Sequence, residues 1–295
     1  MINQGWKDSG DAIFHADGNF AKPPIALAEV QAYAHAAYLG AAELALALDQ
    51  RRRAEELADA ARRLKERFEA AFWLEDVGTY ALALDGANCP CRVRSSNAGH
   101  VLFTGLAAPE RAARASETLM ASQSFSGWGI RTIAESEARY NPMSYHNGSV
   151  WPHDTAVIAS GFGRYGLTEP LLAVWRGLFD ASRYLEFRRL PELFCGFARR
   201  SDTGPTEYPV AAAPQAWAAA AAFGILGTAL GISFAPQEGQ IRFKRPILPP
   251  WLGEVRLTNL RLGEASVDLR LRGAGSDVSL SITRRDGPVE IVLMS

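Results

Sequence analysis

The sequence is poor in cysteine and has no long hydrophobic run. Its three cysteines, Cys89, Cys91 and Cys195, are an odd number and do not form a zinc-type array, which is typical of a protein in a reducing compartment. No run approaches the roughly 20 consecutive apolar residues of a membrane-spanning helix. These absences predict a cytoplasmic protein that does not enter a membrane.

The chain also lacks a charge excess and a cluster of metal-ligating residues. Its 31 Lys and Arg nearly balance its 32 Asp and Glu, for a net charge of −1, so neither a nucleic-acid partner nor an anionic membrane is expected. His146 and His153 have no third histidine or cysteine beside them, and we interpret Cys89-Pro90-Cys91 as a chance pair. We expect no bound metal and no cofactor.

The sequence does contain seven segments with helical periodicity, at residues 25–48, 52–73, 97–106, 109–121, 150–165, 168–186 and 214–231. The first, third, fifth and seventh are mostly apolar all round, whereas the others are apolar on one face only. This alternation predicts a mainly α protein, a toroid of α-hairpins with an inner and an outer helix in each hairpin; an irregular helical bundle is the alternative. A complete (α/α)6 toroid has twelve helices, so we expect an incomplete one whose partner helices before residue 1 are absent.

Beyond Gly231 the composition changes. Residues 232–295 hold short alternating segments separated by turn residues, a pattern typical of strands. We therefore expect a partial barrel over residues 1–231 and a small antiparallel β module over 232–295. A separate hairpin is expected at 79–84, with its turn at Asp85-Gly86.

Polar and aromatic residues gather in six short stretches, at residues 6–18, 94–100, 128–132, 140–154, 189–197 and 204–217. Most of them lie at the start of an inner helix, and in a ring of hairpins all inner helices begin at one mouth. The stretches therefore converge on one pocket, where aromatic faces suit the C–H faces of a sugar and carboxylates and amides suit its hydroxyls. Candidate substrate-binding residues on this argument include Asp11, Asn97, Trp128, Arg131 and Glu207.

A family resemblance rests on the order and spacing of several pieces, NQGWKDSGDAI, EVQAY, SSNAGH, YNPMSYHNGSVWPHD, LPELF and PQAW. From residue 3 to about 231 the chain resembles the amylo-α-1,6-glucosidase (glycogen debranching) family, among the inverting (α/α)6-barrel glycoside hydrolases. The resemblance implies metal-free hydrolysis of α-glucans or short α-glucosides by two carboxylates. Its W-x-D motif implies that Asp8 is the general acid, and its P-E motif implies that Glu192 is the general base.

The same resemblance implies a glucose-binding subsite, lined by Trp6, Glu29, His146, Asn147, Trp151 and Gln215 or Trp217. Related barrels cleave trehalose, mannosylated small molecules and other α-glucosides, so the linkage stays open. In the family the barrel begins well upstream of the W-x-D motif, which is why we expect an upstream polypeptide to complete this one.

Alternatives remain at both carboxylates. Asp11 is a second candidate for the acid, and Glu207 is a second candidate for the base. We expect Asp8 to be partly desolvated beside Trp6, which favours the protonated form that a general acid needs. A different class of function is also open, because a barrel without its first helices would be a carbohydrate-binding or structural fragment.

Overall fold

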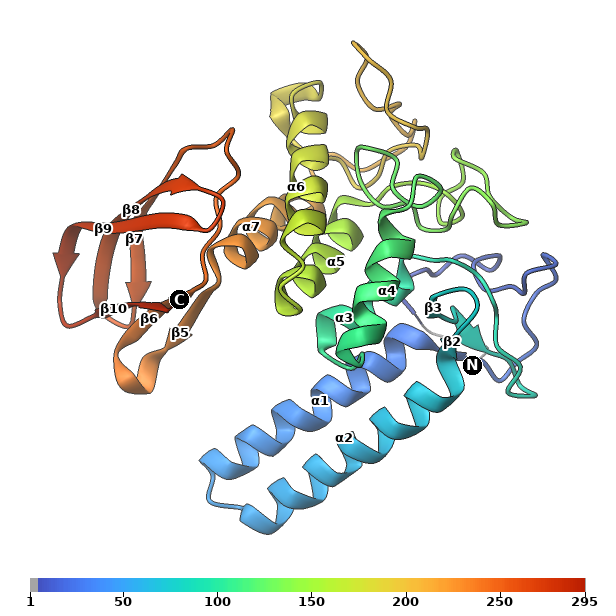
Figure 1. Cartoon of the computed structure of the whole chain (residues 1–295), viewed down its shortest axis with the longest axis horizontal. Helices are drawn as coiled ribbons and strands as arrows, with labels where there is room; N and C mark the ends of the chain where they lie inside the picture. The colour runs from blue at the N-terminus through green and yellow to red at the C-terminus, as the bar shows by residue number, and fades with distance from the viewer. Residues whose placement is uncertain (1–4, 295) are drawn as a thin grey trace. The chain divides into compact units, whose positions relative to one another are not determined.

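The computed structural model describes residues 5–294, except for the side chain of Ala274, so Asn3 and Gln4 of the first motif lie outside it. Its contacts divide the chain into two units, Met1–Ala221 and Ala222–Ser295. The division falls inside the last α-helix, earlier than the change in composition at Gly231. Seven α-helices are present in the described part of the chain (Figure 1): α1 (Ala28–Ala47), α2 (Arg51–Phe72), α3 (Asn97–Thr104), α4 (Pro109–Met120), α5 (Pro152–Arg164), α6 (Thr168–Ser182) and α7 (Ala216–Leu230).

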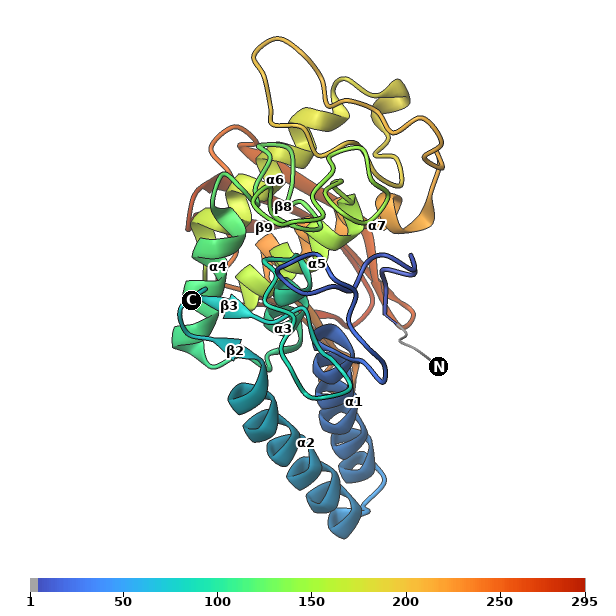
Figure 2. The ribbon, with the colours of Figure 1, turned by 90° about the vertical axis from the view of Figure 1, so that its right-hand side faces the viewer.

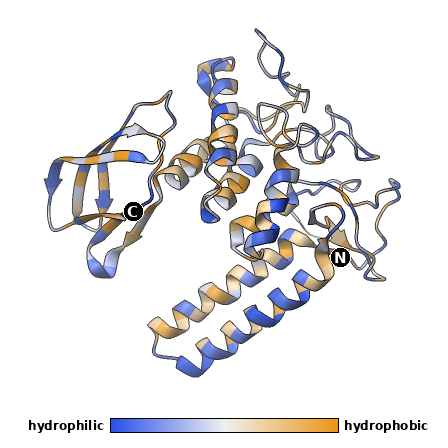
Figure 3. Ribbon diagram, in the orientation of Figure 1, coloured by the Kyte–Doolittle hydropathy of each residue, from blue (hydrophilic) through white to orange (hydrophobic). Residues whose placement is uncertain are grey.

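The helices follow the predicted alternation of character. α2 buries only Ala54, Ala61, Phe68 and Phe72, which share one face, and its other faces carry arginine, lysine and glutamate. Figure 3 shows this contrast between the largely apolar α1 and the largely hydrophilic α2. α3 packs against both α1 and α5, and α1, α3 and α5 each have the next helix along the chain as a neighbour. The inner helices of the first unit therefore lie against one another, and each outer helix packs on its own partner.

Two glycines allow α3 and α5 to approach closely. A Cβ at Gly99 of α3 would overlap the fully buried side chain of Ile158 in α5. A Cβ at Gly161 of α5 would lie 2.8 Å from the Cβ of Leu102 in α3. Real side chains do not approach so closely, so this pair of helices depends on the missing methyl groups.

The Gly99→Ala substitution is expected to lower the free energy of unfolding by about 1–3 kcal/mol, because the added methyl group overpacks the α3–α5 contact. Gly40 of α1 is the matched control, since a Cβ there meets nothing within 4 Å. Gly40→Ala should instead stabilise the protein by about 0.5–1 kcal/mol through helix propensity. Urea unfolding of both variants tests this, and equal effects at the two positions would contradict the packing argument.

One face of α1 departs from the expectation of burial on most sides. The buried residues of α1 are Ala28, Glu29, Ala32, His35, Ala42 and Ala45. Val30, Tyr33, Leu44 and Leu48 are exposed by 39%, 40%, 68% and 70%. The physical reason is that only α2, α3 and the short strand at its start make substantial contact with α1 in the described part of the chain. An apolar face of α1 is left open to solvent.

Short strands connect the helices of the first unit. β1 (Ala26–Leu27) pairs with β4 (Ala83–Leu84), and β2 (Trp73–Leu74) pairs with β3 (Thr79–Tyr80), both antiparallel. The β1–β4 pair ties the start of α1 to the segment that follows α2. The expected hairpin with its turn at Asp85-Gly86 is confirmed around that turn, because Leu84 forms an antiparallel bridge with Pro90 and the Asp85 N–H donates to the carbonyl of Cys89 at 3.0 Å.

The second unit contains two three-stranded sheets. β7 (Glu254–Leu262), β8 (Ala265–Ala274) and β9 (Asp277–Asp286) form an antiparallel meander. β5 (Ile232–Ala235), β6 (Gln240–Lys244) and β10 (Glu290–Met294) form the other sheet. The expectation of an all-antiparallel module is wrong at one pair, because β10 runs parallel to β6. The chain can make this parallel pair because the whole meander serves as the crossover between its two strands.

Candidate active site

Isolated β-bridges join the loops that carry most of the predicted site residues. The bridged pairs are Ser95–Ile133, Arg131–Val150, Val150–Phe194 and Phe194–Glu207. The first loop is attached to them by the Lys7 ammonium, which donates a hydrogen bond to the carbonyl of Thr132 at 2.7 Å. Figures 1 and 2 show these loops gathered on one side of the helices of the first unit. Stretches far apart in the sequence are thus brought together by backbone pairing.

Aromatic rings cluster around Trp6. Its ring lies 6.0 Å from that of His100 in a stacked arrangement, and 5.6 Å from both His146 and Trp151 in edge contacts. His153 adds a further edge contact at 5.1 Å. Trp217, which is 49% exposed, lies 4.3 Å from His153. The cluster therefore extends from a buried aromatic core to an exposed indole, a combination that suits the faces of sugar rings.

Asp8 lies beside His146 at the edge of this cluster. Its Oδ1 is 3.9 Å from His146 Nε2, while Ser9 Oγ contacts His146 Nδ1 at 2.6 Å. Burial, with a smaller effect of Lys7, lowers the pKa of His146 to about 4, so the imidazole is neutral at pH 7 and makes no ion pair with Asp8. The Asp8 side chain is 85% exposed. The expectation that Trp6 desolvates it is therefore wrong for the described residues, because nothing in them covers the carboxylate.

Glu192 is held by donors at both of its oxygens. The phenol of Tyr145 donates to Oε1 at 2.6 Å, and the backbone N–H of Ala212 donates to Oε2 at 3.1 Å. The Glu192 N–H in turn donates to the carbonyl of Ala212 at 2.9 Å. The two donors hold the carboxylate in one orientation, as a positioned general base requires.

The two implied catalytic carboxylates lie beside two residues that are consecutive in the sequence. Tyr145 binds Glu192, and His146 faces Asp8. The Tyr145 ring is also 4.6 Å from the His146 ring. Asp8 and Glu192, which are far apart in the sequence, therefore lie on one site.

Next to Trp6 lies a set of polar side chains that are buried except for Tyr33, which is 40% exposed. His100 Nε2 is 2.7 Å from Asp154 Oδ1, and the Tyr33 phenol is 2.7 Å from His100 Nδ1. Burial acts to raise the pKa of Asp154, but the hydrogen bond from His100 and nearby positive charge, including that of Lys7, outweigh it, and the pKa lies below its usual value. The ionised Asp154 then assigns the proton to His100 Nε2 and leaves Nδ1 to accept from Tyr33. Burial lowers the pKa of Lys7 to about 8, against the opposing charges of Asp154 and Glu29.

Several of these buried groups have no hydrogen-bond partner among residues 5–294. They are both carboxylate oxygens of Glu29, both amide atoms of Asn97, Trp6 Nε1 and Asp154 Oδ2. Glu29 is 1% exposed and Asn97 is fully buried. Because a buried polar atom without a partner costs about 1–3 kcal/mol, this set suits a ligand rich in hydroxyl groups.

Three of the remaining candidates, Asn147, Asp11 and Gln215, make hydrogen bonds with their side chains, whereas Glu207 contacts the site through its backbone. Asn147 donates to the Asp11 carboxylate at 3.1 Å and to its carbonyl at 3.2 Å. Gln215 Oε1 accepts from the N–H of Ala218 at 2.9 Å and so caps α7. Glu207 is exposed, and its backbone pairs with Phe194. Its substrate contact stays a prediction.

Trp128 and Arg131 occupy structural positions. Arg131 is 1% exposed, and its guanidinium donates to the carbonyls of Gly196, Ser122 and Gln123. Trp128 is 2% exposed and packs under the guanidinium of Arg199, 4.4 Å from its ring centre. Arg131 holds loop carbonyls and Trp128 packs under Arg199, so the structure does not direct either side chain at a ligand as the sequence argument expects.

Four residues of the site were absent from the sequence-based candidates: Tyr145, His100, Asp154 and Lys7. Tyr145 and Asp154 lie in the same stretch as His146, and His100 ends the SSNAGH piece. A search for partners that orient the candidate carboxylates and rings would have selected them, because catalytic side chains need donors and acceptors behind them.

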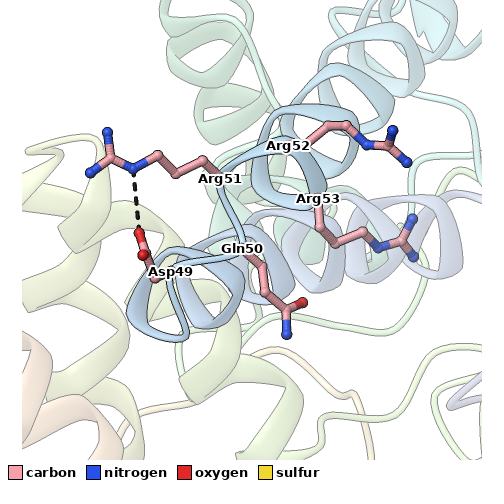
Figure 4. A pocket seen from close by; sticks show the side chains of 5 residues that line it. All are labelled: Asp49, Gln50, Arg51, Arg52 and Arg53. Atoms are coloured by element: carbon pink, nitrogen blue, oxygen red, sulfur yellow. Dashed lines mark hydrogen bonds and ion pairs between the residues drawn. The ribbon is translucent and has the colours of Figure 1, made fainter.

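Among residues 5–294, no group of three or more His, Cys, Asp or Glu side chains is arranged to hold a metal ion. Within the same residues, none of the helices is long and apolar enough to cross a membrane. A surface hollow of about 620 Å³ lies at the α1–α2 turn, lined by Asp49, Gln50, Arg51, Arg52 and Arg53 (Figure 4). None of the predicted site residues lines it.

Stability should fall in mild acid because of His146 and His153. Burial lowers the pKa of both His146 and His153 from 6.5 to about 4. A group whose pKa is depressed on folding contributes its stability above the unfolded value of 6.5 and loses it as the pH falls towards 4. The expected decrease in the free energy of unfolding is about 3 kcal/mol per histidine over this window. Urea titrations from pH 7 to pH 4 measure it, and His153→Gln should flatten the slope; an unchanged slope in this variant would refute the assignment.

The fold is shared with solved glycosidases. The chain resembles a mannosylglycerate hydrolase from Thermus thermophilus (18% identity, TM-score 0.53), with 68% of this chain covering 45% of that one. It resembles the neutral trehalase of Saccharomyces cerevisiae (14%, TM-score 0.55), with 69% covering 38%. It also resembles a rhamnosidase of Bacillus sp. GL1 (16%, TM-score 0.65), with 91% covering 26%. These neighbours are helical-toroid glycosidases, and the chain spans less than half the length of each of these structures.

The family follows from the sequence itself. A family model, the mannosylglycerate hydrolase MGH1-like glycoside hydrolase domain, matches residues 8–195. The match covers more than half of the chain, so the chain belongs to this glycoside hydrolase family. No curated protein matches it significantly by sequence. The expectation of a glycoside hydrolase is confirmed, whereas the comparisons do not single out the debranching enzymes.

Proposed function

We propose that this protein hydrolyses an α-glucosidic bond with inversion, with Asp8 as general acid and Glu192 as general base. One observation carries the proposal: the two carboxylates lie beside the consecutive residues Tyr145 and His146. Inverting glycosidases need two carboxylates about 6.5–9.5 Å apart, one on each side of the sugar ring. Carboxylates that lie beside adjacent residues of an aromatic cluster suit that arrangement.

In the proposed reaction Asp8 gives its proton to the glycosidic oxygen as the bond from that oxygen to the anomeric carbon breaks. Glu192 takes a proton from a water molecule, whose oxygen forms the new bond to the anomeric carbon from the opposite face. Asp8 is exposed in the free protein. A substrate seated over it would exclude water and so favour the protonated form.

The substrate we propose is a short α-glucoside. The buried polar groups next to Trp6 offer hydrogen-bond partners for the hydroxyls of one sugar. The exposed ring of Trp217 offers an aromatic face to the group attached to that sugar. The motif resemblance favours α-1,6 bonds in branched glucans. The proteins of known structure that share the fold bear the names of a mannosylglycerate hydrolase and a trehalase, so these small α-glycosides belong in the same test.

The test is sugar release from isomaltose, panose, a branched limit dextrin, trehalose and mannosylglycerate. Release from the first three would support the debranching specificity. Release from trehalose or mannosylglycerate alone would keep the reaction and change the substrate. No release from any α-glycoside would contradict the proposal.

A second candidate rests on the open apolar face of α1, with Leu44 and Leu48 exposed by 68% and 70%. We propose it as a carbohydrate-binding or structural function, in which helices of another polypeptide cover this face and complete the barrel. Exposed apolar patches of this kind are typical of interaction surfaces. Sugar binding without hydrolysis, together with association of the purified chain, would favour this candidate, and a catalytically active monomer would exclude it. The three free cysteines favour a reducing compartment, and we propose the cytoplasm.

A further inference from the structure

Tyr145 makes a hydrogen bond that the proposed reaction does not itself require. Its phenol donates to Glu192 Oε1 at 2.6 Å, which is short for a hydrogen bond between two oxygens. The other oxygen accepts from the N–H of Ala212 at 3.1 Å. Two donors on different loops thus fix the rotation of the carboxylate, and each oxygen keeps a lone pair for a further partner.

Tyr145 is itself held in place. Its carbonyl accepts hydrogen bonds from Ser149 Oγ at 2.7 Å and from the indole N–H of Trp151 at 2.9 Å. Its ring lies 4.9 Å from that of Trp151 and 5.8 Å from that of Tyr208. A side chain that is fixed at both its backbone and its ring can hold the group it binds in one orientation.

The Tyr145 phenol stays protonated at and around neutral pH. Burial, assisted by the hydrogen bond to Glu192, raises the pKa of Tyr145 above its ordinary value. Tyr145 therefore remains a donor and does not act as an acid or a base itself.

We propose that Tyr145 is a positioning residue for Glu192: it aims the carboxylate at the attacking water and, through its carbonyl, links the base to the Trp151 indole. The inference rests on the proposed function. It assigns to Tyr145 an effect on the base step alone, with no effect on protonation of the leaving group.

The variant Tyr145→Phe tests this with two substrates. A glycosyl fluoride loses fluoride, which is a weak base and leaves without a proton, so its hydrolysis needs the base but not the acid. Tyr145→Phe is expected to lower kcat about 10- to 100-fold on both an α-glucoside and α-glucosyl fluoride, with KM changed less than about threefold. Tyr38→Phe is the control, because this phenol is on the exposed face of α1 and 39% exposed.

The outcomes separate the positioning role from the proposed function. If Glu192→Gln abolishes hydrolysis of the fluoride while Tyr145→Phe leaves kcat unchanged, or changes KM alone, the positioning role is overturned. If Glu192→Gln is as active as the wild type, the proposed function itself is contradicted, because Glu192 is then not the general base. Should Tyr145→Phe not fold, as judged by circular dichroism, Ala212→Pro removes the other donor and must lower kcat on both substrates in the same way.

Discussion

Replacing Glu192 with glutamine is expected to lower kcat by about 10³- to 10⁴-fold on every substrate that the protein cleaves. The amide keeps the shape of the side chain and its contact with Tyr145 but cannot take a proton from water. Because the water attack is the step lost, the same decrease is expected with α-glucosyl fluoride.

Glu207→Gln is the matched comparison for the base. Glu207 is exposed, and no hydrogen bond of its carboxylate to another described residue is seen. We expect it to raise KM less than about tenfold with kcat little changed. A larger loss of kcat in Glu207→Gln than in Glu192→Gln would transfer the role of base to Glu207.

Replacing Asp8 with asparagine is expected to lower kcat by about 10²- to 10⁴-fold on α-glucosides. The asparagine cannot protonate the leaving oxygen, so the loss should be largest for substrates with a poor leaving group. With α-glucosyl fluoride the activity should fall less than about tenfold, since fluoride needs no proton. This contrast separates the acid from the base without reference to pH.

Asp11→Asn is the comparison for the acid, because Asp11 accepts a hydrogen bond from Asn147 at 3.1 Å and belongs to the same loop. Its loss should weaken binding and leave the ratio of glucoside to fluoride rates as in the wild type. The opposite pattern, with Asp11→Asn selective for the glucoside, would make Asp11 the acid.

Much of the helical architecture could be predicted from sequence because it depends on local patterns. The one-sided periodicity of 52–73 and the proline at 109 specify α2 and α4 directly. The convergence of the polar stretches also followed from the expected hairpin topology, and the bridges between the loops show it.

Other features depend on long-range contacts that no local pattern encodes. The open face of α1 could not be foreseen, because an apolar helix predicts burial without naming what covers it. The parallel pairing of β10 with β6 joins residues about fifty positions apart. Arg131 has the side chain of a typical ligand-binding residue, but its guanidinium donates hydrogen bonds to three loop carbonyls.

The most direct test of the central claim is the configuration of the sugar at the moment of release. Hydrolysis of an α-glucoside followed by proton NMR should show the β-anomer first, with the α-anomer appearing only as mutarotation proceeds. Initial release of the α-anomer would mean retention, and would contradict a water attack directed by Glu192 opposite Asp8.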